Sequence, residues 1–287
     1  MKLANLASNM LNIQAIHDAI DAFVLKGGPE AYHIDIPEQK PRGYLGMSAL
    51  GEECVRKTWF GFRKVAKTTF PSRMLRLFRT GDIYEFRIIY LLRGIGFEVF
   101  ERDENGKQFK ATDFGGHLSG SMDGVGKAPE KFGYDKPFLL EFKTVNDKGF
   151  QKYLKDGVKK TNAKYYAQLM LYCGYNDLES ALFIAVNKND ETLHMEHVPF
   201  DKFAFRRLVD RAEHILSATE SPERISSIPS WWACSFCEFK GVCHGGEPAI
   251  KSCRSCKFAV PAEEGKWECT KGQKLGEVCG KYKDITK

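Results

Sequence analysis

The chain has 287 residues, of which 43% are hydrophobic and 28% are charged, and its formal net charge is +6. This composition is that of a globular protein and excludes a largely disordered chain. No apolar run approaches the length needed to span a bilayer, so we expect no membrane partner. The N-terminal segment is interrupted by Asn, Gln, His and Asp, which favours an amphipathic helix over a signal peptide and predicts a cytoplasmic protein.

The first part of the chain is predicted to be helical, and the middle is predicted to alternate between strands and helices. Ser48 is the predicted N-cap of one helix, and Gly94 ends a long helix whose apolar residues recur at helical spacing. Short apolar or alternating runs bounded by glycine predict the strands. The helices are expected over about residues 8–26, 48–62, 73–94, 148–156, 161–175 and 201–217, and the strands over 96–102, 116–126, 138–145, 181–188 and 192–200.

This order of elements predicts an α/β fold built on a mixed sheet, followed by a cysteine-rich tail from Trp231. Two basic stretches stand out. Residues 56–93 hold ten Lys or Arg and two acids, and residues 148–164 hold six Lys and one acid. Such stretches suit a polyanion such as DNA. The alternative for either stretch alone is a solvated helix face.

The strand over residues 138–145 carries an acid and a base, Glu141 and Lys143, on one of its faces, because alternate residues of a strand point the same way. Taken alone, this pair fits a water-facing strand. Asp123, between Gly120 and Gly124, becomes a partner if its segment pairs with this strand. Two carboxylates, completed by water and substrate oxygens, are a usual way to hold Mg²⁺ beside a phosphate. Lys143 would then orient the attacking water or stabilise the charged transition state.

These residues resemble the PD-(D/E)XK nuclease superfamily, and specifically its RecB-like exonuclease branch. Gly120-Ser-Met-Asp123-Gly resembles the aspartate motif, Glu141-Phe-Lys143 the E-x-K motif, and Gln168-Leu-Met-Leu-Tyr172 the Q-x-x-x-Y motif. The resemblance implies a restriction-endonuclease-like core, with a mixed β-sheet flanked by helices. It also implies that Asp123, Glu141 and Lys143 are catalytic, and that Gln168 and Tyr172 position DNA phosphate or support the metal ligands.

Residues four apart share a helix face, so Gln168 and Tyr172 can point the same way, with Tyr165 nearby. The alternative is an ordinary amphipathic helix with Tyr172 in the core. Upstream, the branch often carries G-x-x-x-H, whose histidine is a metal ligand, whereas this chain has Gly81-Asp-Ile-Tyr-Glu85. Glu85 is therefore assigned as a metal ligand beside Asp123 and Glu141, and the change from imidazole to carboxylate favours Mg²⁺ over Mn²⁺. The alternative for Glu85 is a surface ion pair with Arg79 or Arg87.

The resemblance implies a Mg²⁺- or Mn²⁺-dependent exonuclease that hydrolyses phosphodiester bonds from single- or double-stranded DNA ends. It further implies a role in recombination, repair or phage DNA processing, in a bacterial or phage-infected cytoplasm, with a recombination or annealing protein as partner. Two alternatives stay open. One is a structure-specific endonuclease of the same superfamily, and the other is a non-catalytic DNA-binding module that holds zinc or an iron–sulfur cluster.

Eight of the nine cysteines fall into two sets of four, which in a chain without a secretory signal favours metal ligation over disulfides. The arrangement of the first set resembles that of the iron–sulfur nucleases of the RecB-like branch, and implies a 4Fe–4S cluster. The alternatives are zinc on the same thiolates, or His244 in place of Cys243. The proposed ligands of this set are Cys54, Cys234, Cys237 and Cys243.

The second set reads as a structural zinc site with four thiolate ligands, because a tail of this size cannot bury a self-sufficient core. Its proposed ligands are Cys253, Cys256, Cys269 and Cys279. The ninth, Cys173, is expected in the core. The expected division is therefore a nuclease domain over residues 1–230, a cluster segment over 231–247 and a zinc knuckle over 248–287.

Overall fold

The computed structural model describes residues 10–25, 42–67 and 72–287. Predictions that concern residues 1–9, 26–41 and 68–71, including the end of the first helix, lie outside the described residues. The chain forms two compact units. Unit 1 comprises Met1–Gln39, Phe70–Ala111 and Ser121–Lys202, and unit 2 comprises Lys40–Thr69, Thr112–Gly120 and Phe203–Lys287. The expected division at residues 230 and 247 stays a prediction.

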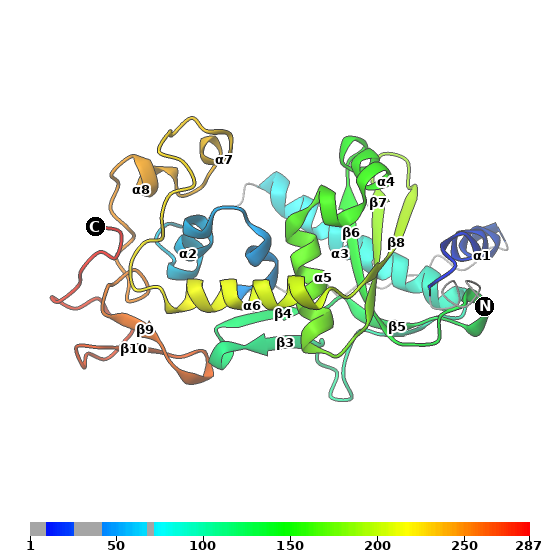
Figure 1. Cartoon of the computed structure of the whole chain (residues 1–287), viewed down its shortest axis with the longest axis horizontal. Helices are drawn as coiled ribbons and strands as arrows, with labels where there is room; N and C mark the ends of the chain where they lie inside the picture. Colours follow the sequence, from blue (N-terminus) through cyan, green and yellow to red (C-terminus); the bar gives the residue numbers. More distant parts are fainter. Residues whose placement is uncertain (1–9, 26–41, 68–71) are drawn as a thin grey trace. The chain divides into compact units, whose positions relative to one another are not determined.

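Unit 1 is built on a five-stranded mixed sheet in the order β2-β5-β6-β7-β8 (Figure 1). The central strands β6 and β7 are parallel, and the outer pairs β2–β5, β5–β6 and β7–β8 are antiparallel. A parallel pair needs a crossover connection, and α4 and α5 supply it. The predicted mixed α/β fold is confirmed. The strands are β2 (Glu98–Phe100), β5 (Gly124–Lys127), β6 (Phe138–Val145), β7 (Ser180–Asn187) and β8 (Leu193–Pro199).

Helices pack against this sheet because alternate side chains of each strand point to opposite faces. Leu140 and Phe142 of β6 share one buried core with Ile88 and Leu92 of the long helix α3. Glu141, between them in sequence, points the other way and meets α5. The helices of unit 1 are α1 (Ile13–Leu25), α3 (Ser72–Gly94), α4 (Asp147–Thr161) and α5 (Ala163–Tyr175), with a short 3₁₀ turn η5 (Glu130–Phe132).

Two asparagines set the starts of the crossover helices. Asn146 caps α4, its side chain accepting from the Gly149 N–H at 2.9 Å, and Asn162 caps α5. The cap of α5 accepts from the N–H groups of Lys164 and Tyr165 at 3.1 and 3.3 Å. Gly157, at φ +67°, kinks α4. There Glu196 accepts from the backbone N–H of Val158 at 2.7 Å.

Unit 2 contains short elements, among them a parallel bridge between β1 and β4 and an antiparallel hairpin of β9 and β10. The strands are β1 (Leu45–Gly46), β3 (Lys110–Asp113) and β4 (Leu118–Ser121), of which β3 and β4 cross the division between the units, and β9 (Ala259–Pro261) and β10 (Trp267–Cys269). The helices are α2 (Val55–Arg63), α6 (Lys202–Ser217), which begins at the division, α7 (Trp232–Ser235) and α8 (Lys240–His244), with 3₁₀ turns η3 (Met47–Gly51), η4 (Phe114–Gly116) and η6 (Glu263–Gly265).

Two local predictions are corrected. Ser48 does not cap the helix expected to run to Phe62, because Ser48 lies inside η3 and the helix begins only at Val55. Cys54 caps α2 instead, with extended backbone and its Sγ accepting from the Lys57 N–H at 3.4 Å. The strand expected over residues 116–126 is interrupted at Met122 and Asp123, and β3 was not anticipated. In the part of the chain that the structure describes, no helix has the length and apolarity to cross a membrane.

Candidate active site

Asp123 and Glu141 converge because their segments are neighbouring strands. β5 begins directly after Asp123 and pairs with β6 in a register that sets Gly124 opposite Leu140. The Asp123 carboxylate accepts a hydrogen bond from the Phe142 N–H, with 2.9 Å between Oδ2 and N. The prediction that these two segments pair is confirmed. The break between β4 and β5 therefore directs Asp123 toward the strand that carries Glu141 and Lys143.

Glu141 is a fully buried carboxylate, with 0% of its surface exposed. Its Oε2 accepts from Gln168 Nε2 at 3.0 Å, and its Oε1 forms an ion pair with Lys143 Nζ. Burial, followed by repulsion from Asp123, raises the pKa of Glu141 to about 8, although Lys143 opposes the shift. Burial and Asp123 thus make the charged form of Glu141 unfavourable, and binding of a proton or a cation would relieve this cost.

Lys143 lies at the centre of the site. Its Nζ donates to the Phe142 carbonyl at 2.9 Å and lies 3.9 Å from Asp123 Oδ2, in addition to its ion pair with Glu141. The ammonium also sits over the Tyr165 ring, 5.2 Å from the centroid. Burial would lower the pKa of Lys143, but Glu141 and Asp123 outweigh it and raise the pKa above its ordinary value. Lys143 is therefore a permanent cation beside two carboxylates.

Helix α3 adds Glu85 to the same electrostatic cluster. Burial, then repulsion from Asp123, and further from Glu141, raises the pKa of Glu85 to about 8. Arg87, one of the two partners considered for a surface ion pair, instead contacts Glu191 at 2.6 Å. The charged groups that act on Glu85 are thus those of the site, and its role as a metal ligand stays a prediction.

Asp82 was not assigned from the sequence, yet it belongs to this cluster. Burial raises the pKa of Asp82, Arg79 opposes the shift and Asp123 adds to it. Asp82 also contributes to the raised pKa of Glu85. The sequence signal that could have found Asp82 is its position three residues before Glu85, because residues three apart on a helix are surface neighbours.

Helix α5 supplies the remaining predicted residues. Gln168 reaches Glu141, as described above. Tyr172, one turn later, is 3% exposed and packs within the buried part of the helix. Its predicted role in positioning phosphate stays a prediction. Tyr165 contributes the ring under Lys143, and its own ring packs against Phe183 at 6.3 Å.

The donor set of Asp123 and Glu141 fits a hard divalent cation, since both groups are carboxylates whose mutual repulsion a cation would relieve. Within residues 10–25, 42–67 and 72–287, no three His, Cys, Asp or Glu side chains are gathered as a group that could hold a metal ion. Mg²⁺ usually takes only one or two protein carboxylates and completes its shell with water and phosphate oxygens. Two converging carboxylates are therefore sufficient for this ion.

All four cysteines of the first set belong to unit 2. Burial, followed by the thiolate charges of Cys243 and Cys54, raises the pKa of Cys234, and Cys54 also contributes to the raised pKa of Cys237. Cys54 is thus within electrostatic reach of residues about 180 positions later in the sequence. These interactions link Cys54 with Cys234 and Cys237, but within the described residues the four cysteines do not form a group that could hold a metal ion.

The second cysteine set lines one small cavity of about 20 Å³ in unit 2. All four of its members, Cys253, Cys256, Cys269 and Cys279, contribute to the wall. Cys173, the ninth cysteine, is fully buried in α5, and burial raises its pKa to about 12, so its expected place in the core is confirmed.

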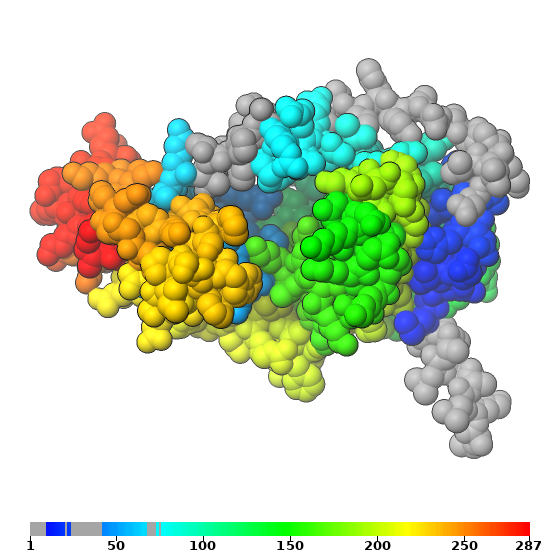
Figure 2. All heavy atoms as spheres, turned by 90° about the horizontal axis from the view of Figure 1, so that it is seen from above, coloured from blue at the N-terminus to red at the C-terminus, as the bar shows by residue number. Residues whose placement is uncertain are grey.

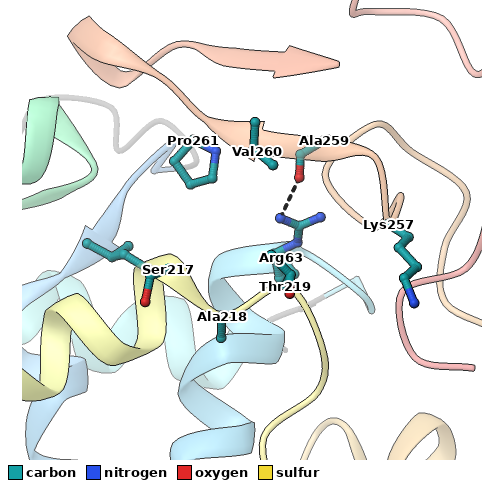
Figure 3. A pocket seen from close by; sticks show the side chains of 9 residues that line it. Arg63, Ser217, Ala218, Thr219, Lys257, Ala259, Val260 and Pro261 are labelled. Atoms are coloured by element: carbon teal, nitrogen blue, oxygen red, sulfur yellow. Dashed lines mark hydrogen bonds between the residues drawn. The ribbon is translucent and has the colours of Figure 1, made fainter. Parts of the chain in front are cut away.

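A larger cavity of about 270 Å³ in unit 2 is lined by the end of α6, by β9 and by Arg63 (Figure 3). The Arg63 guanidinium is buried and donates to the carbonyls of Ala259 and Cys256 at 2.9 and 2.6 Å. These bonds join α2 to the segment of the second cysteine set. None of the predicted site residues lines this cavity.

No family model matches the chain, and no curated protein matches it. Solved structures that it resembles include SSO0001, at 14% identity and a TM-score of 0.41, covering 80% of this chain and 94% of that chain. They also include LHK-Exo, an alkaline exonuclease from Laribacter hongkongensis, at 15% identity and a TM-score of 0.43, covering 61% of this chain and 87% of that chain. The structure of LHK-Exo in complex with dAMP gives a TM-score of 0.44 at the same identity and coverage. Similarity at this level establishes no family for the chain.

Proposed function

We propose that this protein is a metal-dependent deoxyribonuclease of the PD-(D/E)XK type, in the RecB-like exonuclease branch. The observation that carries the proposal is the convergence of Asp123, directly before β5, with Glu141 and Lys143 of β6, and with Gln168 donating to Glu141. Three sequence motifs that were identified separately thus meet in one place. A surface role for the Glu-x-Lys pair does not account for a fully buried Glu141.

The chemistry follows from the charges of the site. Mg²⁺ or Mn²⁺, when bound by Asp123 and Glu141, would polarise the phosphodiester and lower the pKa of water. Lys143, fixed by the Phe142 carbonyl and the Tyr165 ring, would offset negative charge that develops on the phosphate. Gln168 would hold Glu141 in the orientation that ligation needs. Glu85 replaces the histidine of relatives, and an all-oxygen site favours Mg²⁺.

The test is degradation of end-labelled single- and double-stranded DNA with Mg²⁺ or Mn²⁺. Asp123→Ala should lose activity by at least about a hundredfold, because the metal ligand is removed. The matched control is Asp135→Ala, which removes an exposed carboxylate of the same unit and should keep full activity. Equal activity of wild type and Asp123→Ala would refute the site.

Two alternatives are separated by further substrates. Cutting of a covalently closed circle would favour a structure-specific endonuclease over an exonuclease. Binding of DNA without any hydrolysis, equal in wild type and Asp123→Ala, would favour a non-catalytic DNA-binding module. The cytoplasmic role in recombination, repair or phage DNA processing, with a recombination or annealing protein as partner, is supported by the family resemblance alone.

We also propose that the first cysteine set holds a 4Fe–4S cluster, supported by the electrostatic interactions of Cys54 with Cys234 and Cys237 and of Cys234 with Cys243. The second set is proposed to hold zinc, supported by the cavity that its four thiols line. The experiment is metal analysis after oxygen-free purification. A brown protein with iron, sulfide and one zinc is expected. A colourless protein with two zinc ions would show that the first cysteine set holds zinc and not a 4Fe–4S cluster.

A further inference from the structure

Helix α4 carries a row of lysines along its outer side. Lys148, Lys152 and Lys155, here called the lysine stripe, are spaced by four and three residues, which places them on one side of a helix. All three are exposed, whereas Phe150 and Tyr153 on the other side are buried. The stripe precedes the kink at Gly157, so its members lie on one straight segment. Figure 2 shows this part of the chain, in bright green, uncovered at the surface.

Two acids, Asp147 and Asp156, lie on the same helix as the stripe. Within the described residues, no ion pair joins any of the three lysines to a carboxylate. Asp147, the first residue of α4, accepts hydrogen bonds from Gln151 at 3.3 Å and Asn187 at 3.1 Å. Asp156 is the other acid of the helix and is exposed. Three exposed ammonium groups without a direct ion pair therefore lie within about 10 Å along the axis, at about 1.5 Å per residue.

The stripe is connected to the proposed site through the body of α4. Tyr153, on the buried side, packs its ring against Phe183 at 5.3 Å, and Phe183 packs against Tyr165. Tyr165 in turn lies under Lys143. The stripe thus lies on the side of α4 that faces away from the site, and at least one helix diameter, roughly 10–12 Å, separates the two. A separation of this size corresponds to three or more phosphates of one DNA strand, at about 3.4 Å per phosphate.

We propose that the lysine stripe binds the phosphate backbone of DNA, several nucleotides from the bond that the site would cleave. This inference rests on the proposed function. A row of exposed lysines recognises the spacing and charge of a phosphate backbone and makes no contact with base edges, so it would hold DNA of any sequence. It would raise the affinity for long substrates and leave the chemical step unchanged, because it does not reach the reacting phosphate.

The binding experiment compares two triple variants of equal charge change. Lys148→Gln, Lys152→Gln and Lys155→Gln together remove the stripe. Lys107→Gln, Lys110→Gln and Lys127→Gln remove three other exposed lysines of unit 1. Affinity for a duplex with an overhang is measured without divalent cation over a range of salt. Loss of three phosphate contacts should lower the slope of log affinity against log salt by about 2.7, at 0.9 per contact, and weaken binding about tenfold or more.

An equal effect of both triple variants, or no effect of the stripe variant, would overturn the proposal. Thermal unfolding of each variant shows whether it is folded. With the metal added, the stripe variant should raise KM for long DNA, keep kcat, and behave as wild type on a trinucleotide too short to reach α4. Binding and cleavage by wild type separate the two proposals. If wild type binds DNA but does not cleave it, and the stripe variant alone loses affinity, the proposed function fails while the stripe stands.

Discussion

Replacing the buried carboxylate by its neutral isostere, Glu141→Gln, should change the stability of the protein in a pH-dependent way. Because the folded pKa of about 8 lies above the ordinary value of 4.5, the folded state binds more protons than the unfolded state between these values. Stability therefore falls as pH rises through this window, and the full cost is present above about pH 8. The neutral amide of the variant does not ionise, so this cost is absent. Lys143 keeps the Phe142 carbonyl and Asp123 as neighbours.

The size of the effect follows from the two pKa values. At 1.36 kcal/mol per pH unit, the raised pKa of Glu141 costs the cation-free folded protein about 3 kcal/mol at pH 7 and about 5 kcal/mol at pH 9. At pH 4 the carboxyl is protonated in the folded state and mostly so in the unfolded state, so that the variant and wild type should differ least. The stability of Glu141→Gln relative to wild type should thus increase by several kcal/mol from pH 4 to pH 9.

The assay is hydrogen exchange of the β6 amides, Phe138–Val145, in buffer without divalent cations, because these amides report on the unit that contains the site. Lys136→Gln, which removes an exposed charge of the same unit, is the matched control and should show no such trend. Adding Mg²⁺ at pH 8 should protect wild type and should not protect Glu141→Gln. A difference between variant and wild type that is constant from pH 4 to pH 9 would refute the raised pKa.

Three further outcomes are expected. Asn162→Ala should cost about 1 kcal/mol in urea unfolding, because the cap of α5 is lost; an unchanged midpoint would contradict that. Gly157→Ala should cost about 1–3 kcal/mol in the same assay, since its backbone at φ +67° disfavours a side chain and a Cβ would lie 2.8 Å from Glu196 Oε1. Tyr165→Leu should lower kcat about tenfold by releasing Lys143, while Tyr165→Phe, which keeps the ring, should retain the wild-type rate; equal rates for Leu and Phe would remove the ring from the site.

Structural features that depend only on residues close in sequence, such as single helices and strands, were predictable. The helix over residues 73–94 and the strand over 138–145 follow from the period of their apolar residues, and the structure has them as α3 and β6. The shared face of Glu141 and Lys143 follows from the same alternation. Ser48 was misassigned because the residue that caps a helix depends on where the backbone changes from extended to helical. Here that residue is Cys54, whose backbone is extended and whose Sγ accepts from the Lys57 N–H.

The candidate site residues could be proposed from the sequence, because their order and spacing carry the resemblance to the nuclease motifs. Their electrostatic state was not, because burial and charge depend on chain segments that are distant in sequence. Tertiary structure alone closed Glu141 off from water, brought Asp82 within reach of Asp123, and set the Tyr165 ring under Lys143. The sequence thus determined which groups are present, and the packing of α3 and α5 about β6 decided how strongly those groups act on one another.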